Sequence, residues 1–286
     1  MQTDGVDHEQ YRVDSRERWE AGATGWAARR EEFQAATAPV SQWMVDAVDP
    51  KPGEVVLDLA AGVGDTGFLA AQRIAPDGRL ITSDGAEAMI EQAQARAAEL
   101  GLANVEFKPM EAEWIDLGTA TVDCVLCRWG YMLLADPETA LRETRRVLRP
   151  GGRLALAAWD APEHNTWVTA FGAVLVERGF EPPPDPELPG MFSFARPGTI
   201  EALLDAAGFA DWRVDAVDFE FEAASFEEWW EYQYDVSPLL ARALAPLTPE
   251  QRDDAYDGIE RRLAIYTAED GTLRLPARTL VAAAEA

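Results

Sequence analysis

A glycine-rich segment between two acidic residues is the strongest chemical signal in this sequence. Gly62, Gly64 and Gly67 follow a short apolar run that itself contains Asp58. Glycine lets a backbone approach a ligand closely, and the free N–H groups at the start of a following helix can bind a polar or anionic group. Asp84 follows Gly62 by about 20 residues, the spacing at which an acid commonly holds ribose hydroxyls. These residues predict a site for a cofactor that contains adenosine.

The glycines alone do not identify that cofactor. Their spacing fits the G-x-G-x-x-G pattern of nicotinamide dinucleotide binders, but S-adenosylmethionine also contains adenosine and ribose. At this point an NAD(P)-dependent oxidoreductase and a methyltransferase both remain open. A catalytically inactive regulator that only binds the cofactor is a third interpretation.

One histidine is the candidate catalytic residue. The chain contains 2 histidines, and His164 comes shortly after the apolar run 153–159, which predicts a strand. Ligands of parallel sheets bind beyond the carboxyl ends of the strands. His164 is therefore predicted to be a general base or a polar anchor for the substrate. The competing interpretation is a histidine on a solvent-facing loop.

Aromatic residues near the ends of the predicted strands and in the later helical segments indicate an apolar substrate pocket. The candidates are Tyr131, Trp159, Trp230 and Tyr234. Core packing is the alternative for each of them, because large aromatic side chains are mostly buried. We predict a small, largely apolar substrate.

Alternating strand-like and helix-like segments must position these residues. From residue 53 to 160, apolar runs alternate with helical periodicity, which is typical of a parallel sheet covered by helices on both faces. The predicted strands are 55–59, 79–82, 105–107, 122–127, 153–159, 212–221 and 273–284. The expected fold class is α/β: a doubly wound, mostly parallel, seven-stranded sheet with a helical lid.

Helical segments outside this alternation are expected to form the lid. Residues 1–50 are an N-terminal helical lid segment, and residues 51–160 are the cofactor-binding core. Residues 161–286 complete the sheet and carry two helical insertions, 161–207 and 225–266, which are expected to cover the substrate.

Composition limits the partners of the protein. Asp and Glu total 51 against 25 Lys and Arg, a formal net charge of −26. Such a surface repels a phosphate backbone, so nucleic acid is not an expected partner. No apolar run reaches the roughly 18 residues that a membrane span needs, and the acidic start lacks the features of a secretory signal. We expect a cytoplasmic protein, and its oligomeric state is not defined by the sequence.

The two cysteines do not predict a metal site. Cys124 and Cys127 lie three residues apart in a predicted strand, so their side chains point to opposite faces. No second cluster of cysteine or histidine completes a ligand set. No metal is expected.

Five motifs, taken in order, resemble those of the class I S-adenosylmethionine-dependent methyltransferases, the ubiquinone and menaquinone C-methyltransferase group among them. The motifs are Val56–Gly64, Asp84–Ile90, Met110–Glu113, Asp123–Arg128 and Val147–Leu154. Dinucleotide folds usually lack the strand acid of the first motif. The resemblance implies a Rossmann-like fold, S-adenosylmethionine as cofactor, and methyl transfer to carbon or oxygen of a small aromatic, quinone-like or natural-product-like acceptor.

The resemblance also implies which residues hold the cofactor, three of them with departures from the family pattern. The implied contacts are Ala60, Gly62 and Gly64 with the methionine portion, Asp84 with ribose, Gly85, Met89, Glu111 and Ala112 with adenine, and the Cys127 carbonyl beside the cofactor. Ala60 stands where the family usually has glycine. Gly85 replaces a bulky apolar residue, and Glu111 replaces an aspartate.

Overall fold

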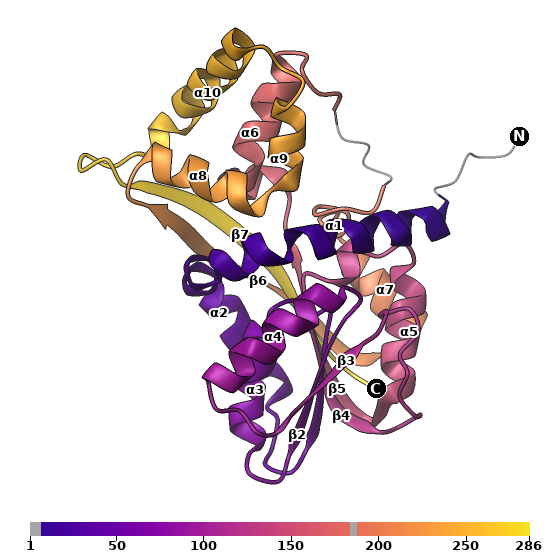
Figure 1. The fold of residues 1–286 in the computed structure, drawn as a ribbon. Helices are drawn as coiled ribbons and strands as arrows, with labels where there is room; N and C mark the ends of the chain where they lie inside the picture. Colours follow the sequence, from indigo (N-terminus) through magenta and orange to yellow (C-terminus); the bar gives the residue numbers. More distant parts are fainter. Residues whose placement is uncertain (1–6, 184–187) are drawn as a thin grey trace, which may run out of the picture.

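A seven-stranded sheet lies at the centre of the computed structural model, which describes residues 7–183 and 188–286 (Figure 1). The strand order is β3-β2-β1-β4-β5-β7-β6. The strands are β1 (Val55–Leu59), β2 (Arg79–Asp84), β3 (Val105–Pro109), β4 (Val122–Arg128), β5 (Leu148–Trp159), β6 (Ala210–Ala223) and β7 (Leu273–Glu285). Strands β1 to β5 pair in parallel, and β7 is antiparallel to both β5 and β6. The predicted fold class is confirmed, as a mixed sheet.

Helices cover both faces of this sheet (Figure 1). One layer contains α2 (Arg30–Val48), α3 (Asp65–Ile74) and α4 (Glu87–Glu99), and the other contains α5 (Pro137–Val147) and α7 (Thr199–Ala207). Central strands β1 and β4 are almost wholly buried, as their nearly continuous apolar sequences require. The carboxyl ends of the parallel strands therefore meet at one edge, where a ligand site can form.

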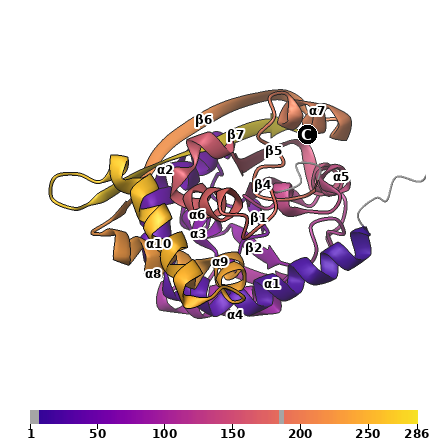
Figure 2. The same ribbon diagram turned by 90° about the horizontal axis from the view of Figure 1, so that it is seen from above.

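A group of helices extends beyond that edge and forms a cap (Figures 1 and 2). The cap consists of α6 (Thr166–Glu177), α8 (Phe226–Val236), α9 (Pro238–Leu244) and α10 (Pro249–Leu263). Ser225 accepts a hydrogen bond from the Glu228 N–H and so caps α8, and Thr248 forms a capping box with Gln251 at the start of α10. Helix α1 (His8–Ala28) contacts both α8 of the cap and α4 of the sheet layer.

Helix α2 was expected to be part of the lid, but it packs on the sheet. Phe33, Val40, Met44 and Val48 are all buried on this helix. Their spacings of seven and four residues form one apolar stripe, and the helix packs against β5, β6 and β7. Of the segment 1–50, the part that lies against the cap is therefore chiefly α1.

Strand β5 also begins earlier than predicted. It starts at Leu148 and includes Pro150–Gly152, whereas the predicted strand began at residue 153. Its pairing with β4 is irregular at this point, because the register shifts between Val122 and Cys124. The carboxyl end at Trp159 is where the sequence placed it.

No helix in the described part of the chain combines the length and the apolar character needed to cross a membrane.

Candidate functional site

The turn after β1 contains two glycines that serve different purposes. Gly62 has a φ of +53°, and a Cβ built on it would meet nothing within 4 Å, so its backbone borders open space. Gly64 has a φ of +87° and caps α3, and a Cβ there would collide with the Phe68 ring. Ala60 also has a positive φ, +53°. The turn is thus left-handed at three places and leaves one face of its backbone open at Gly62.

Asp58 is a buried residue of β1 that connects the strand to the start of α3 by a hydrogen bond. Its side chain is 1% exposed, and its Oδ2 accepts a hydrogen bond of 2.9 Å from the Gly67 N–H in the first turn of α3. A Cβ at Gly67 would overlap the Asp58 carboxyl group, which explains this glycine. Burial raises the pKa of Asp58 to about 7, against the opposing effects of Arg128 and the Gly67 N–H. Asp58 is therefore a buried structural acid beneath the site.

Asp84 lies at the carboxyl end of β2 and faces the turn. Its Oδ2 accepts from the Gly62 N–H at 2.9 Å, and its Oδ1 accepts from the Ala86 N–H at 3.0 Å. Burial raises its pKa, while the two backbone hydrogen bonds act in the opposite direction. Each carboxylate oxygen can accept a further hydrogen bond. Asp84 therefore has capacity left for a ligand that carries two hydroxyl groups.

Glu111 and Gly85 meet beside Asp84. A Cβ at Gly85 would come to 2.9 Å from Glu111 Oε2, so the glutamate occupies the space over the glycine. Arg16 of α1 pairs with Glu111 at 3.4 Å. Burial is the largest influence on Glu111 and raises its pKa. The side chain of Glu111, which is longer than the aspartate of the family pattern, thus fits into the space left by Gly85.

Met89 belongs to a small apolar cluster between the turn and α1. Met89, Val63, Ala86 and Ala23 are all buried there, with two tryptophans of α1 packed against them. Ala112 is also buried, at 5% exposure. In this structure α1 thus covers the apolar side of the expected adenine position.

Cys127 lies at the end of β4, next to the same turn. Burial raises the pKa of its thiol to about 12, so the thiol is protonated and is no nucleophile at neutral pH. A Cβ at Gly130 would be 2.7 Å from both the Ala60 Cβ and the Cys127 Sγ. The segments that follow β1 and β4 are therefore in van der Waals contact.

An aromatic cluster lies beyond the ends of β4 and β5. Trp129, directly after β4, has a φ of +61° and stacks on Trp159 with ring centroids 4.4 Å apart and an angle of 5°. Its Nε1 donates to Thr279 Oγ1 at 3.3 Å. Trp167 and Phe221 continue the cluster into α6 and β6. Non-glycine residues with a left-handed backbone, such as Trp129, are concentrated at ligand and active sites.

Tyr131 occupies a different environment from the one expected of a substrate contact. It is 1% exposed, and its hydroxyl forms a 2.7 Å hydrogen bond with Thr144 of α5. Burial raises its pKa well above the ordinary value. In this structure Tyr131 therefore acts as a core residue that attaches the segment after β4 to α5.

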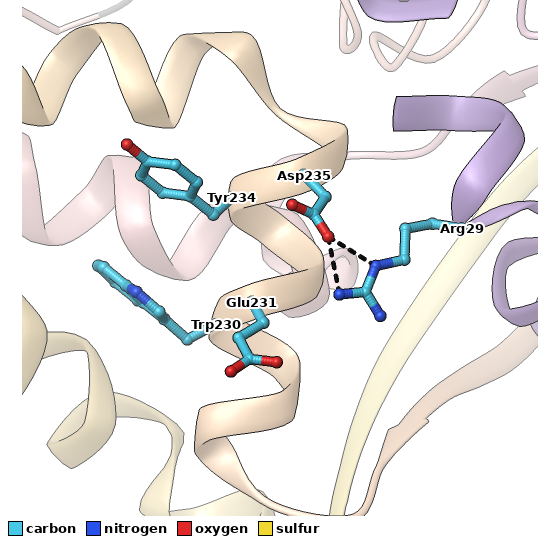
Figure 3. A pocket seen from close by; sticks show the side chains of 5 residues that line it. All are labelled: Arg29, Trp230, Glu231, Tyr234 and Asp235. Atoms are coloured by element: carbon cyan, nitrogen blue, oxygen red, sulfur yellow. Dashed lines mark hydrogen bonds and ion pairs between the residues drawn. The ribbon is translucent and has the colours of Figure 1, made fainter. Parts of the chain in front are cut away.

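Trp230 and Tyr234 lie on α8 and line an open pocket of about 410 Å³ (Figure 3). The other lining residues are Arg29, Glu231 and Asp235, and Figure 3 shows the ion pair of Arg29 with Asp235, whose closest N···O distance is 2.7 Å. None of the expected cofactor residues lines this pocket. Of the four aromatic candidates, only Trp159 joins the cluster beside the Gly-rich turn.

His164 lies on a single 3₁₀ turn, Pro162–His164, just after β5. Its side chain is 42% exposed, and its Nδ1 is 2.9 Å from Oδ2 of Asp160. The fully buried Asn165 fixes this loop, because it donates to the Asp160 carbonyl and accepts from the Arg278 N–H. The imidazole is thus oriented by an acid at the edge where ligands of such sheets bind.

A buried ion-pair network, which was not predicted from the sequence, lies behind the turn. Asp65, the first residue of α3, is 3% exposed and pairs with Arg96 and with Arg128, the latter at 2.9 Å. Arg128 also donates to Thr37 and Ser41 of α2, and its guanidinium lies 4.7 Å from the centre of the Trp129 ring. Only the charge and apolar surroundings of Arg128 were visible in the sequence, and its partners lie more than sixty positions away.

Metal ligands do not gather in the described residues, since no group of three or more histidine, cysteine or acidic side chains there could hold an ion.

Residues 50–173 match a family model described as a methyltransferase domain. The chain is 32% identical over 198 residues to nocamycin O-methyltransferase of Saccharothrix syringae, covering 66% of this chain and 71% of that enzyme. It is 31% identical over 131 residues to a ubiquinone/menaquinone biosynthesis C-methyltransferase of Cellvibrio japonicus, covering 46% of this chain and 53% of that one. The chain thus spans about half the length of this second relative.

Solved structures agree on the fold. The YcgJ protein from Bacillus subtilis superposes with a TM-score of 0.57 at 20% identity, over 86% of this chain and 97% of that one. A phosphoethanolamine N-methyltransferase of Haemonchus contortus, solved with S-adenosylmethionine, gives a TM-score of 0.53 at 19% identity, over 86% of this chain and 52% of that one.

Proposed function

Since this chain belongs to the class I S-adenosylmethionine-dependent methyltransferases, we propose that it methylates carbon or oxygen of a small, largely apolar acceptor held beneath its helical cap. The observation that carries this proposal is the meeting of the open Gly62 backbone and the Asp84 carboxylate beside an aromatic cluster. The Gly62 backbone and the Asp84 carboxylate suit an adenosine cofactor, and the aromatic cluster suits an apolar, ring-containing acceptor.

The residues around the turn fit the cofactor. Asp84 has free acceptor capacity for the ribose hydroxyls, and the open backbone at Gly62 allows close approach of the methionine portion. Met89 offers an apolar surface for adenine, while Glu111 and the Ala112 N–H would address its polar edge. The Cys127 carbonyl would lie beside the cofactor, as the family pattern implies. The acid at 84 would then accept hydrogen bonds that favour its charged form.

S-adenosylmethionine supplies an activated methyl group on a sulfonium. The chain therefore needs mainly to orient the acceptor and to exclude water, which contribute most of the rate in such a transfer. Helix α1 covers the turn, and the buried rings of Trp129 and Trp159 line the region next to it. Both features would keep water away from a cofactor bound at the turn.

His164 is proposed as the base for acceptors whose proton is hard to lose. Its Nδ1 contact with Asp160 would fix the ring orientation and leave Nε2 to accept the proton. His164→Ala is expected to lower kcat by a factor of about 10² to 10⁴, the usual contribution of a positioned base, and to leave binding of S-adenosylhomocysteine unchanged. Full turnover in this variant with a confirmed acceptor would remove His164 from the mechanism.

The apolar acceptor is supported by the aromatic cluster and by the kinds of relative found. One relative is named as the O-methyltransferase of nocamycin, and another as a C-methyltransferase of ubiquinone and menaquinone biosynthesis. A formal charge of −26 also makes a phosphate-rich acceptor such as nucleic acid a poor match.

Calorimetric titration with S-adenosylhomocysteine and with NAD tests the cofactor. We expect micromolar binding of the first and none of the second, and loss of binding in Asp84→Asn, which removes the charge while keeping the shape. Thr199→Val, in the distant helix α7, is the matched control and should bind normally. Binding of NAD alone would contradict the proposed function.

Incubation with methyl-labelled S-adenosylmethionine and a panel of phenols, quinones and polyketide-like compounds tests the transfer. We expect label in at least one compound of this class. A protein that binds the cofactor but labels no member of the panel would favour a non-catalytic regulator.

A further inference from the structure

Three buried polar atoms in the cap have no hydrogen-bond partner among the described residues. They are Nε1 of Trp167 on α6, and the hydroxyl of Tyr232 and Oε1 of Gln233 on α8. The three side chains are 4%, 8% and 1% exposed, respectively. Native proteins pair nearly all such groups, because an unpaired buried donor or acceptor destabilises the fold. Three such unpaired atoms on two neighbouring helices point to a ligand that supplies the missing hydrogen-bond partners.

The hydrogen bonds around Trp167 determine how Gln233 presents its amide. The Trp167 carbonyl accepts from Gln233 Nε2 at 2.8 Å and from Trp229 Nε1 at 3.1 Å. A carbonyl can only accept, so the NH₂ end of the amide must face it, and Oε1 must face elsewhere. An indole N–H can only donate. The pair thus offers one donor, from Trp167, and one acceptor, from Gln233.

The position of Trp167 connects this polar pair to the reaction site. Its ring lies 4.1 Å from the Phe221 ring and 5.1 Å from the Trp159 ring, between centroids. Trp159 in turn stacks on Trp129, the residue that follows β4. Because Trp167 is on α6 and is hydrogen-bonded to α8, a planar molecule that extended from the Gly-rich turn along these rings would bring its far edge to these two helices.

Tyr232 adds a third polar group on the same helix. Burial raises the pKa of its hydroxyl above the ordinary value, with the charges of Glu32 and Arg29 contributing in opposite directions. The hydroxyl therefore stays neutral, and it can either donate or accept.

We propose that Trp167, Gln233 and Tyr232 recognise the polar edge of the acceptor, and that this edge presents a hydrogen-bond donor beside an acceptor, as a cyclic amide does. This assignment rests on the proposed methyltransferase function and names the class of substrate: a planar, mostly apolar molecule with a lactam-like edge. The atoms are closed to solvent in this structure. Binding of such a molecule would therefore require the cap to move away from the sheet. Trp230 and Tyr234 then lie outside the recognition site, on the outer pocket.

Two probes that differ by one hydrogen-bond donor test this assignment. 2-Quinolone presents N–H beside C=O, and N-methyl-2-quinolone keeps the ring and carbonyl but lacks the N–H. Titrated into protein saturated with S-adenosylhomocysteine, 2-quinolone is expected to bind about tenfold more tightly, the usual effect of one unmatched buried polar group. Gln233→Met should abolish this preference, because Oε1 is lost while Trp229 still donates to the Trp167 carbonyl.

Thr199→Val is the matched control for these titrations. Its hydroxyl is also buried and unpaired, but it lies on α7, away from the cap. It should keep the tenfold preference. Wild-type protein that binds both probes equally or neither of them, or a Gln233→Met variant that keeps the preference, would overturn the assignment.

Thermal unfolding without ligand gives a second readout. Tyr232→Phe removes an unpaired hydroxyl, so its Tm is expected to rise by about 2 °C while its affinity for 2-quinolone falls. A lower Tm would mean that the hydroxyl already has a partner, and its recognition role would be rejected. Failure of the wild-type protein to bind S-adenosylhomocysteine would contradict the proposed function itself, whereas normal binding without probe preference contradicts only this inference.

Discussion

Ala60 adopts a backbone conformation that its own Cβ opposes. Its φ of +53° lies in the left-handed region, which costs a non-glycine residue roughly 1–2 kcal/mol. Ala60→Gly should therefore raise the free energy of unfolding by about 0.5–1 kcal/mol, after the greater freedom of glycine in the unfolded chain is subtracted. Urea unfolding measures this change.

Ala120 offers a matched control for that substitution. Its φ is +54°, but it lies in the turn before β4, at the opposite end of the strand from the site. Ala120→Gly should stabilise the protein similarly without altering affinity for S-adenosylhomocysteine. If Ala60→Gly destabilises the fold, the side chain at 60 has a packing role that outweighs its strain, against Gly130 and Cys127.

Asp58 should make stability depend on pH in an unusual direction. Its pKa is raised to about 7 in the folded state from an ordinary value of 3.8, so the folded protein holds the proton more tightly than the unfolded chain. Stability from this residue is complete below pH 4 and is lost as pH rises toward 7, by at most about 4 kcal/mol. Relative to Asp58→Asn, wild type should lose stability over that window, as measured by urea unfolding at several pH values.

A second acid gives the opposite sign and serves as the control. The pKa of Asp46 is lowered by hydrogen bonds from Gln42 and Arg73. Wild type should therefore gain stability over Asp46→Asn as pH rises through the ordinary range of aspartate. The same trend in both variants would show that burial does not govern Asp58.

At this scale the sequence indicated the individual residues better than their partners. Gly62 and Asp84 were recognisable because a turn and a strand end require particular backbone and charge properties at fixed spacing. Asp65 and Arg128 were not, because an ion pair between distant positions leaves no local pattern. Tyr131 was placed in the substrate pocket for a similar reason, since its partner Thr144 lies on another element.

Helix α1 is attached to the rest of the molecule mainly by polar contacts. Ala23 is its one buried residue, although the helix has 21 residues. Arg12 pairs at 2.7 Å with Glu113, which is 1% exposed, and Glu20 accepts from the Glu87 and Ala88 N–H groups at the start of α4. Apart from Ala23, Trp19 and Trp26, few apolar side chains hold this helix, so its attachment depends strongly on a small number of hydrogen bonds.

Arg12→Met should loosen α1 selectively. It leaves the Glu113 carboxylate buried with the Asp136 N–H as its remaining partner, and breaking a buried ion pair in this way costs about 3–5 kcal/mol when the fold cannot relax. We expect α1 to detach locally, with faster amide hydrogen exchange in residues 8–28 and little change in the sheet.

The double variant Arg12→Met/Glu113→Gln should recover part of the protection, since it removes the unpaired charge. Glu17→Gln, at an exposed position on the same helix, is the control and should exchange like wild type. Uniform acceleration across the sheet in Arg12→Met would show that α1 unfolds only with the whole domain.

At the level of elements, the strand pattern was predictable where both faces are buried. β1 was placed with its observed ends, because a continuous apolar run bounded by turn residues allows few alternatives. Helix α2 was assigned to the lid because it lies outside the alternation of strands and helices, whereas its apolar stripe faces β5 to β7. Which surface an amphipathic helix covers depends on tertiary packing, and its own sequence does not contain that information.

The charge of the whole molecule opposes its compact state. A formal net charge of −26 produces mutual repulsion that salt screens, as the Debye length falls from about 30 Å at 0.01 M to about 10 Å at 0.1 M. We expect Tm to rise with NaCl over this range. Choline chloride should give the same increase if screening is the cause, and a falling Tm would mean that the surface ion pairs outweigh the repulsion.

Arg128 touches three parts of the molecule at once: Asp65 behind the Gly-rich turn, Ser41 on α2, and the face of Trp129. Arg128 therefore links the Gly-rich turn of the proposed cofactor site to the aromatic cluster of the proposed methyl-acceptor site, and any coupling free energy between the two ligands must be the same in both directions. A substitution at Arg128 can be interpreted only from a full thermodynamic cycle, with each ligand titrated in the absence and in the presence of the other.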